Sequence, residues 1–407
     1  MRYWGSFGIV TIFAPTLPAR WPIRECLPLK SSLLRFVSCV VITSYSATAA
    51  ANAKLTPNAD LSLERKINIK EQETGKWLPV PIPVSNPTVG AGLQAALLYL
   101  HPKKAGDDSE TPSATSGLGG MYTNTDSKVI GVFHDNYFAN DKYRLKLVAG
   151  VGDLNLDFYG VGDSTVGSSF SYNIKPMITF AQFMVRVPYM ESSYIGIKHL
   201  YSDAEVEFQF NIDLPPEYLG LEVPALKFES ITSTLGLVYT YDSRNDGFYP
   251  SEGINSSLSY NSDDEAWGSG YKFQRLTGSY KQYFSLTETQ TLAIKGAISD
   301  VDGDPPFYML STLQMRGFAT GRYLDNTSAS LHAEWRYKFA ERWGVNVFAE
   351  SGKIGDSLDH LINSNAVDSF GLGLRWQPIA SKKLNLGVDV AQSSDDSAVY
   401  LRVGEAF

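Results

Sequence analysis

The sequence predicts an all-β protein, a transmembrane antiparallel β-barrel, and three observations carry this prediction. Apolar and polar residues alternate along the last eighty residues, 328–407, as in the segment LHAEWRYKF at 331–339. Successive side chains of a strand point to opposite faces, so one face of such a strand is apolar. The chain also opens with the features of an export signal. Beyond that segment it has no apolar run of about 18 or more residues, which excludes a helical membrane protein.

The composition agrees with a sheet-rich chain that does not bind nucleic acid. Charged residues make up 19% of the 407 residues, below the roughly 25% of typical soluble domains. The 23 tyrosines, 21 phenylalanines and 34 glycines suit strands and tight turns better than helices. The formal net charge is -8, whereas a nucleic-acid partner needs a basic face, so no nucleic-acid partner is predicted.

Residues 1–53 are predicted to be a secretory signal peptide. Two basic residues precede the apolar stretch 36–43, and small residues follow up to Ala53. This order is typical of a cleaved signal, and the apolar stretch is too short for an anchor helix. Both cysteines, Cys26 and Cys39, lie in this segment. The exported chain is therefore expected to have no disulfide, no Cys-ligated metal and no cysteine nucleophile.

Residues 54–86 are predicted to form a short periplasmic or plug segment, and the barrel is expected to occupy residues 87–407. The end of the short segment, LPVPIPVSNP at 78–87, is rich in proline. Proline lacks the backbone N–H that a strand donates to its neighbour, so this stretch is not expected to be a central strand.

Fifteen strand-like blocks follow one another, and a long interruption at 301–327 precedes the last five. The blocks are 88–101, 115–124, 128–138, 142–158, 168–188, 193–211, 229–242, 254–262, 269–286, 289–300, 328–339, 343–352, 368–377, 383–392 and 397–407. Bacterial single-chain barrels normally have an even number of strands. Either a strand is hidden within 60–86 or 212–228, or one block lies outside the wall. The prediction is therefore a 16-stranded barrel, with 14 strands as the alternative.

A soluble β-sandwich is the competing architecture. In the final strands the apolar faces carry residues such as Leu372 and Trp376. The opposite faces gather charged side chains, namely Glu334, Arg336, Lys338, Glu350, Arg375, Asp389 and Arg402. A sandwich packs its apolar faces inward, whereas a barrel in lipid turns them outward and lines its lumen with the polar ones. The export signal, the long succession of strands and the aromatic residues at strand ends favour the barrel.

Three local motifs lie on or between these strands. They are Met315-Arg316-Gly317-Phe318 in the long interruption, Phe348, Glu350 and Gly352 on a strand after it, and Asp242, Arg244, Pro250 and Gly253 in a turn before it. They resemble the Omp85 superfamily, the BamA/TamA or bacterial surface antigen D15 type of barrel. That family carries a V/I-R-G-F/Y tip on its sixth extracellular loop, an F-x-D/E-x-G strand, and a D-x-R-x-x-x-F-x-P-x-x-G periplasmic turn. Met315 here replaces the usual Val or Ile.

The resemblance implies that the loop folds into the lumen and that Arg316 pairs with Glu350, with Glu334 as a second acidic neighbour. Period-two counting agrees, because it places Glu350 on the lumenal face, and a buried guanidinium needs a carboxylate partner. Gly317 and Gly352 would leave room for the close approach of the loop.

The last strand is expected to end with an apolar face. This face carries Val399, Leu401, Val403 and Phe407. The resemblance implies that these residues form the C-terminal signal that the barrel assembly machinery recognises during biogenesis. Glu405 departs from this pattern, because an apolar or aromatic residue is usual at that position.

The resemblance implies an outer-membrane protein of a Gram-negative bacterium that acts in protein insertion or translocation, through a lateral seam between its first and last strands. The alternative is a passive or gated pore, or a surface structural protein. Expected partners are outer-membrane lipids, lipopolysaccharide and a protein or lipid cargo, and the oligomeric state is left open. Family members usually carry periplasmic POTRA modules, but residues 54–86 are too few and too rich in proline for one.

No catalytic residue, cofactor or metal site is predicted. The segment Gly90-Ala91-Gly92 resembles part of a dinucleotide-binding fingerprint, but it follows proline-rich sequence instead of a buried strand. Asp359-His360, beside Ser357, has no spacing that assembles a nucleophile, a base and an orienting group. Acidic loops such as 263–265 are more typical of solvated charge than of a cation site.

Overall fold

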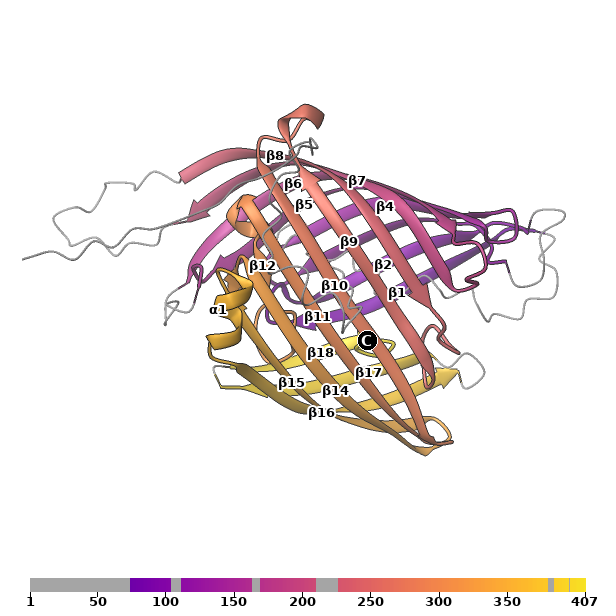
Figure 1. Ribbon diagram of the computed structural model, residues 1–407. Coiled ribbons are helices and arrows are strands. Elements are labelled where there is room, and N and C mark those ends of the chain that lie inside the picture. Colours follow the sequence, from indigo (N-terminus) through magenta and orange to yellow (C-terminus); the bar gives the residue numbers. More distant parts are fainter. Residues whose placement is uncertain (1–73, 104–110, 163–168, 210–225, 380–383, 395) are drawn as a thin grey trace, which may run out of the picture. The chain divides into compact units, whose positions relative to one another are not determined.

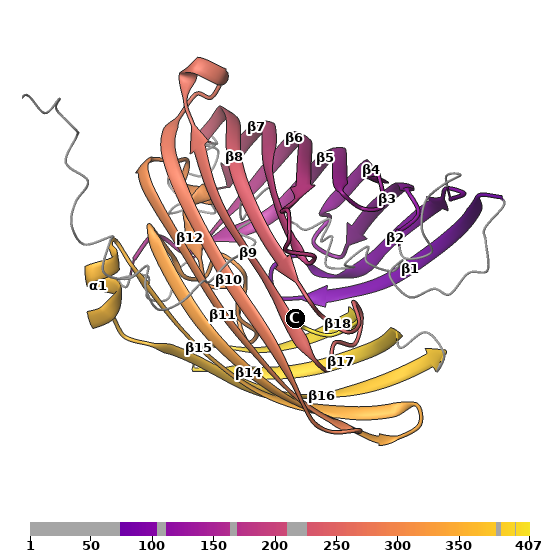
Figure 2. The same cartoon turned by 45° about the vertical axis from the view of Figure 1, so that its right-hand side comes forward.

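The computed structural model describes residues 74–103, 111–162, 169–209, 226–379, 384–394 and 396–407. These residues form an all-β closed barrel of sixteen antiparallel strands (Figures 1 and 2). The predicted fold class and the prediction of 16 strands are confirmed. The predicted signal peptide lies outside the described residues.

The wall strands range from 7 to 17 residues in length. In chain order they are β1 (Lys76–Asn86), β2 (Gly90–Leu100), β3 (Thr115–Thr123), β4 (Lys128–Phe138), β5 (Tyr143–Phe158), β6 (Phe170–Arg186), β7 (Ser193–Gln209), β8 (Leu226–Asp242), β9 (Gly253–Asp263), β10 (Lys272–Thr287), β11 (Gln290–Asp304), β14 (Thr327–Ala340), β15 (Trp343–Gly355), β16 (Val367–Ile379), β17 (Leu384–Ser393) and β18 (Ser397–Val403). Each strand pairs with its neighbours in this order, and β1 closes the barrel against β18.

Short elements lie in the connections between wall strands. They are η4 (Glu265–Trp267), η5 (Phe307–Met309), β12 (Ser311–Thr312), β13 (Leu324–Asp325) and α1 (Leu358–Asn363). Strands β12 and β13 pair with each other and hold the base of the loop between β11 and β14, called the long loop below. No described helix is long and apolar enough to cross a membrane. We call the end of the barrel that carries the β8–β9 connection the turn end, and the opposite end the loop end.

The barrel wall begins earlier in the chain than the sequence suggested. Strand β1 lies within 60–86, one of the two stretches that could hide a strand. The expected start of the barrel at residue 87, and the assignment of residues 76–86 to a plug segment, are therefore wrong. β1 is the strand that the even-number argument required, and it accounts for the difference between fifteen blocks and sixteen wall strands.

The prolines of β1 are compatible with a wall strand because of their spacing. β1 pairs with β2 along all of its 11 residues, which requires backbone N–H groups on that side. In an antiparallel strand the N–H groups of alternate residues point to opposite edges. Pro79, Pro81 and Pro83 alternate, so their missing N–H groups all lie at the edge that faces β18. Proline therefore interrupts one edge of β1 and leaves the other intact.

The outer face of the wall is apolar and the inner face is polar. Leu331 is 61% exposed and Leu372 is 63% exposed, whereas Glu334 and Arg375, on the opposite faces of the same strands, are buried. A sandwich would bury the leucines and expose the charges. The arrangement is that of a barrel made for lipid, and it decides between the two architectures in favour of the barrel.

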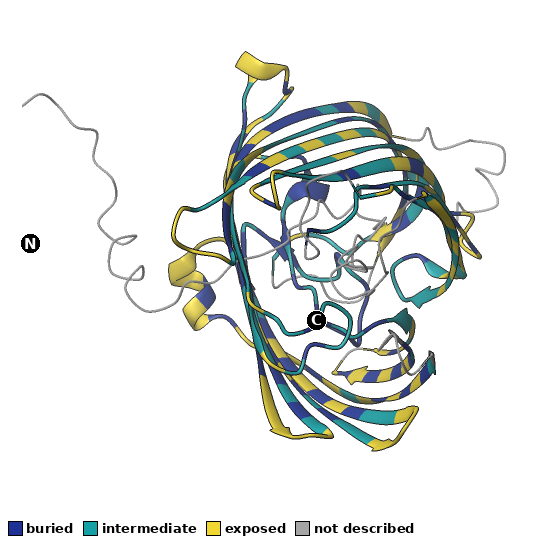
Figure 3. Cartoon of the chain, turned by 90° about the vertical axis from the view of Figure 1, so that its right-hand side faces the viewer, coloured by how far each residue is buried: buried dark blue, intermediate teal, exposed yellow. Residues whose placement is uncertain are grey.

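The long loop folds into the space enclosed by the strands, where Figure 3 shows chain segments inside the ring. Its first part, η5, packs into an apolar cluster on the inner wall. The Phe307 ring lies 5.2 Å from the Tyr172 ring and 5.3 Å from the Phe208 ring, measured between centroids. This aromatic anchor on β6 and β7 holds the start of the loop, and the loop tip reaches the opposite wall.

Candidate functional site

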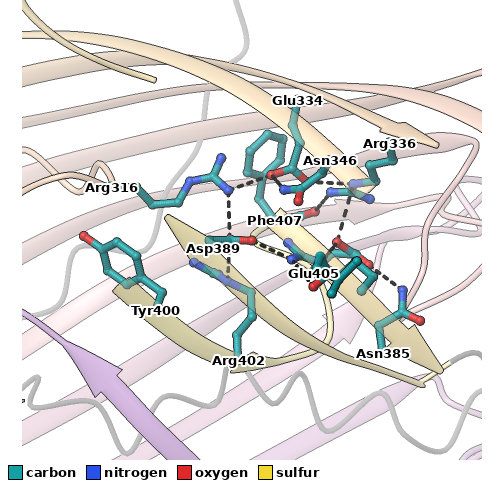
Figure 4. A network of polar contacts seen from close by, with 12 residues as sticks. Arg316, Glu334, Arg336, Asn346, Asn385, Asp389, Tyr400, Arg402, Glu405 and Phe407 are labelled. Atoms are coloured by element: carbon teal, nitrogen blue, oxygen red, sulfur yellow. Dashed lines mark hydrogen bonds and ion pairs between the residues drawn. The ribbon is translucent and has the colours of Figure 1, made fainter. Parts of the chain in front are cut away.

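Charged side chains from five strands, the long loop and the end of the chain meet inside the barrel (Figure 4). This lumenal charge network consists of Arg316, Arg336, Arg375, Arg402, Glu334, Glu350, Asp389 and Glu405. β14 contributes two members and β15 to β18 contribute one each, always from the inward face. The formal charges of the four arginines and four carboxylates cancel. Each buried charge of the network therefore has an opposite charge beside it, which offsets the cost of removing it from water.

Arg316, at the tip of the long loop, lies at the centre of the network. Its backbone N–H donates to Glu350 Oε2 at 2.6 Å, and its Nε donates to Glu350 Oε1 at 2.7 Å. Its Nη1 donates to Glu334 Oε2 at 2.7 Å and to Asp389 Oδ2 at 3.2 Å. The guanidinium carbon lies 3.3 Å from the centre of the Phe348 ring, a cation–π contact. The structure therefore brings the loop arginine against both acidic residues that the sequence associated with it.

Two glycines make the approach of the loop possible. Gly317 has a φ of +104°, and a Cβ there would lie 3.2 Å from the Cβ atoms of Ser369 and Ser393. Gly352, on β15, faces the loop: a Cβ there would lie 2.6 Å from Met315 Sδ. Both positions therefore need the absence of a side chain, Gly317 for its backbone conformation as well as for space.

Apolar contacts surround the charged tip. Met315 and Phe318, which flank Arg316 and Gly317, are buried in a small cluster with Leu313 and Ile354. The Phe318 ring packs edge-on against Tyr323 at 5.0 Å between centroids. Methionine therefore fills the place of the usual Val or Ile beside the glycine of β15.

The long loop contacts both sides of the junction between β1 and β18. The Gly317 N–H donates to Tyr400 Oη, on β18, at 2.9 Å. The Thr320 N–H donates to Thr88 Oγ1, in the β1–β2 turn, at 2.7 Å. The loop thus bridges the first hairpin and the last strand from inside the lumen.

The junction itself, called the seam below, has almost no strand pairing. β1 and β18 share a single residue pair, Ser85 with Leu401, whereas β1 and β2 pair over 11 residues. One side-chain bond supplements it, from Ser85 Oγ to the Val399 carbonyl at 3.2 Å. Pro83 contributes to the break, because the register places it opposite Val403, the last residue of β18, and it has no N–H to donate there.

The connection between β8 and β9 is stabilised by hydrogen bonds between its own polar residues. Arg244 donates from Nε and Nη2 to the two oxygens of Asp242, at 3.0 and 2.9 Å. Gly253 has a φ of +100°, and a Cβ there would lie 2.3 Å from the Ser243 carbonyl oxygen. The Pro250 carbonyl accepts from Arg336 Nη1 at 3.3 Å, which links this turn to the lumenal charge network.

The end of the chain departs from the expected apolar face. Val399 and Leu401 are exposed on the outer face, but β18 ends at Val403 and Gly404 has a φ of +85°. The tail then turns into the lumen, so the expectation that Phe407 shares the lipid face is wrong. The cause is chemical: Glu405 accepts from Arg375 Nε at 2.9 Å and from Asn385 Nδ2 at 2.6 Å.

Phe407 is buried beside the lumenal charge network. Its carbonyl oxygen accepts from Arg336 Nη2 at 2.8 Å, and its ring packs in a cluster with Tyr283 and Ala293. Sequence reasoning missed this site, because period two was continued past the end of the strand. The two signals that could have found it are Gly404 and the charge of Glu405 on a face expected to be apolar.

The His-containing loop segment forms a helix cap. Ser357 Oγ accepts from the His360 backbone N–H at 3.3 Å, which caps the first turn of α1. His360 Nδ1 lies 3.1 Å from Asp356 Oδ1, and all three residues are exposed. The Ser357 hydroxyl accepts from a backbone N–H and donates to Asp356, and it makes no hydrogen bond with the His360 ring. This segment therefore holds no nucleophile–base pair.

A closed sixteen-stranded barrel whose long loop folds inward and sets an arginine among lumenal carboxylates has the architecture of an Omp85-type barrel. The Omp85 superfamily domain matches residues 115–407, and the chain belongs to this superfamily. No curated protein sequence matches it. The residues that the structure describes contain no POTRA module.

Solved structures share the fold at low sequence identity. BamA from Haemophilus ducreyi lacking POTRA domains 1-3 matches with a TM-score of 0.56 and 16% identity, over 82% of this chain and 71% of that one. CdiB from Acinetobacter baumannii matches with a TM-score of 0.52 and 9% identity, over 81% and 60%. CdiB from Escherichia coli gives 0.54 and 11%, over 81% and 62%. This chain thus spans less than two thirds of the CdiB chains, and the likeness is one of fold.

Proposed function

We propose that this protein acts in the insertion or translocation of proteins at the outer membrane of a Gram-negative bacterium, and that client strands engage it at the seam. The observation that carries the proposal is the pairing of β1 with β18 through one residue pair, Ser85 with Leu401. Unpaired strand edges are templates for the addition of another strand. The client class is a polypeptide that can present an extended segment.

The edge of β18 supports this role better than the edge of β1. Continuing the register of Ser85 with Leu401 would place Pro83 opposite Val403. Because proline donates no hydrogen bond, the carbonyl groups on this part of β18 find no donor on β1, while the proline carbonyls can still accept from β18. A client strand with ordinary N–H groups gains about 1 kcal/mol for each bond it makes there. The prolines therefore keep the last strand available to a partner.

The loop contacts support a gating role for the long loop. Its tip is held by Arg316 and touches Tyr400 on one side of the seam and Thr88 on the other. A segment that contacts both sides restrains their separation. Release of the tip would free the two sides to part, while the rest of the barrel wall stays paired. Outer-membrane lipids and lipopolysaccharide would surround the apolar outer face, and the barrel assembly machinery would insert the chain itself.

A reversible lock at the seam tests the proposal. The variant Ser85→Cys with Leu401→Cys places two thiols on directly opposed residues, within the reach of a disulfide. The assay follows the insertion of a urea-unfolded eight-stranded outer-membrane barrel into liposomes that contain the purified protein. The wild type should accelerate insertion over empty liposomes, the oxidised variant should not, and reduction should restore the rate. Ser85→Cys alone is the control. Equal rates for oxidised and reduced forms would refute the role of the seam.

The alternative function, a passive or gated pore, is less well supported because the long loop and the tail occupy the lumen. Recording single channels in planar bilayers separates the two. A large, steady conductance would favour a pore. Brief openings that change when residues 310–325 are deleted, or when Arg316 is replaced, would favour a seam gated by the loop.

A further inference from the structure

One guanidinium in the lumen, that of Arg275, contacts the Phe273 ring at 5.9 Å but has no carboxylate at ion-pair distance among the residues that the structure describes. Arg275, on β10, is 6% exposed, and it makes no hydrogen bond or ion pair with any residue that the structure describes. Its Nε and Nη2 are both buried without an acceptor. Every arginine of the lumenal charge network faces a carboxylate, so Arg275 is an exception in the same barrel. A buried charge without a partner is costly.

Asp263 lies two residues along β9 from Asn261, the residue that pairs with Arg275, and other side chains already donate hydrogen bonds to it. Asp263, at the end of β9, accepts from Thr234 Oγ1 at 3.0 and 2.8 Å through its two oxygens. It also accepts from Ser269 Oγ at 3.4 Å. These hydroxyls stabilise Asp263 on the side of β8 and of the β9–β10 connection. Asp263 attracts Arg275 electrostatically, but the two side chains form no ion pair or hydrogen bond, so the donors of the guanidinium stay without an acceptor.

A second cation points toward the same place. Lys198 on β7, Gly236 on β8, Asn261 on β9 and Arg275 on β10 form one row across four paired strands. A Cβ at Gly236 would lie 2.8 Å from Lys198 Cε, so the lysine side chain crosses the glycine. Its Nζ then reaches Ser259 Oγ, on β9, at 3.2 Å. The glycine thus lets a lysine from two strands away approach the side of β9 where Arg275 lies.

Polar groups without a charge complete the surroundings. Asn261 lies between the two cations in the row, and its Oδ1 is buried without a partner. Ser259 Oγ and Thr277 Oγ1 lie 2.7 Å apart and share a hydrogen bond. A hydroxyl can rotate to donate its hydrogen to an anion, and a side-chain amide can present its NH2 group in place of its oxygen. The row therefore offers two positive charges and adaptable donors.

We propose that Lys198 and Arg275 form a lumenal binding site for a compact oxyanion, a phosphate or a carboxylate group. The planar fork of a guanidinium matches two oxygens of such a group, and an ammonium adds a point charge. The site lies on β7 to β10 and is separate from the lumenal charge network on β14 to β18. The inference does not rest on the proposed function, since an anion can bind whether or not the seam opens.

Ligand-dependent stability of the purified barrel in detergent tests the site. The probes are inorganic phosphate, sodium chloride at equal ionic strength, and a short-chain phosphatidic acid, with the midpoint of thermal unfolding as readout. Phosphate should raise the midpoint of the wild type in a saturable way that chloride does not reproduce. Arg275→Gln and Lys198→Gln should each weaken the apparent affinity at least about tenfold. Stabilisation by inorganic phosphate would identify a free anion, and stabilisation by the lipid alone would identify a headgroup.

Two controls keep the outcome clear. Lys338→Gln removes another half-buried lysine, which bonds Gln377 on a different part of the wall, and should leave the response to phosphate unchanged. If Arg275→Gln does not fold, Arg275→Lys and Lys198→Gln carry the test: the first keeps both charges of the row but loses the planar guanidinium, and the second keeps only the charge of Arg275. The proposal is overturned if neither phosphate nor the phosphorylated lipid stabilises the wild type more than chloride does. It is also overturned if the variants respond like the wild type.

Discussion

Arg316 and Glu350 are joined by two hydrogen bonds of different origin. One carboxylate oxygen accepts from the backbone N–H of Arg316 at 2.6 Å, and the other accepts from the side-chain Nε at 2.7 Å. Glu350 therefore fixes both the path of the loop and the direction of the guanidinium. Removing the side chain of Arg316 would leave the backbone bond in place and the charge of the carboxylate uncompensated.

Arg316→Ala should destabilise the barrel by about 3–5 kcal/mol, because it leaves buried carboxylates without their cation. Glu350→Gln should cost less, about 1–3 kcal/mol, since Glu334 and Asp389 still pair with Arg316. Denaturant unfolding of the folded barrel in detergent measures both. Arg322→Ala, on the same loop and against the Tyr159 ring, is the matched control and should change stability much less. Equal effects at the two arginines would contradict the central role of Arg316.

Gly352→Ala should destabilise the protein by about 1–3 kcal/mol, because the added Cβ would lie 2.6 Å from Met315 Sδ and 2.8 Å from Leu313 Cδ2. Both atoms are ends of flexible side chains, so they can shift but must lose contacts. Met315→Ala should therefore cost less in the Gly352→Ala background than in the wild type. A double-mutant cycle measures this coupling, which should favour the double variant by at least about 0.5 kcal/mol. Additive effects would mean that the methionine does not limit the space.

Replacing Pro79, Pro81 and Pro83 together by valine should close the seam. The register of the single pair places position 83 opposite Val403, and valine there would supply the missing donor. Restored bonds should add up to about 3 kcal/mol at about 1 kcal/mol each. Hydrogen exchange of the amides of β18 should slow, and insertion of the unfolded test barrel should slow with it. The change is informative even if stability is unaltered: unchanged exchange would show that proline is not what keeps the seam open.

The alternation of side chains was sufficient to predict the wall, but it could not predict where strands lose partners. Fifteen of the sixteen strands follow from period two and turn residues, because burial on one face alone produces that pattern. The even strand number predicts a further strand within 60–86 or 212–228, but the prolines argue against the first stretch, although alternate prolines remove the donors of only one edge. The spacing of Pro79 and Pro81 carries that information.

The candidate site was predictable only in part, because alternation shows which face of a strand a side chain lies on but not which residue it contacts. Arg316 and Glu350 could be associated, whereas the partners of Arg336 and Arg375 could not. Alternation gives the face of a side chain and says nothing about which residues meet across a lumen. Glu405 was placed outside, because the pattern does not tell where a strand ends.

The prolines of β1 should favour the inward turn of the tail together with the contacts of Glu405, and both contributions can be tested at Glu405. The register of the seam would place Glu405 opposite Pro81 and Phe407 opposite Pro79, so a straight tail would face an edge without donors. The tail instead gains Arg375 and Asn385 as partners. Glu405→Gln keeps the shape and removes the charge, so it should free the tail at a cost of about 1–3 kcal/mol.

Labelling measures the release of the tail. Without the predicted signal peptide, the variant Ala406→Cys has one thiol, because both natural cysteines lie in that segment. A soluble maleimide should react slowly with this thiol when Glu405 is present. It should react several-fold faster when Glu405→Gln is added. Lys338→Gln is the control, since it removes a lumenal charge that does not contact the tail. Combining Glu405→Gln with valine at the three prolines should slow labelling again, because the freed tail would then find donors on β1. If the prolines have no effect on labelling, the tail turns inward because of its charge alone.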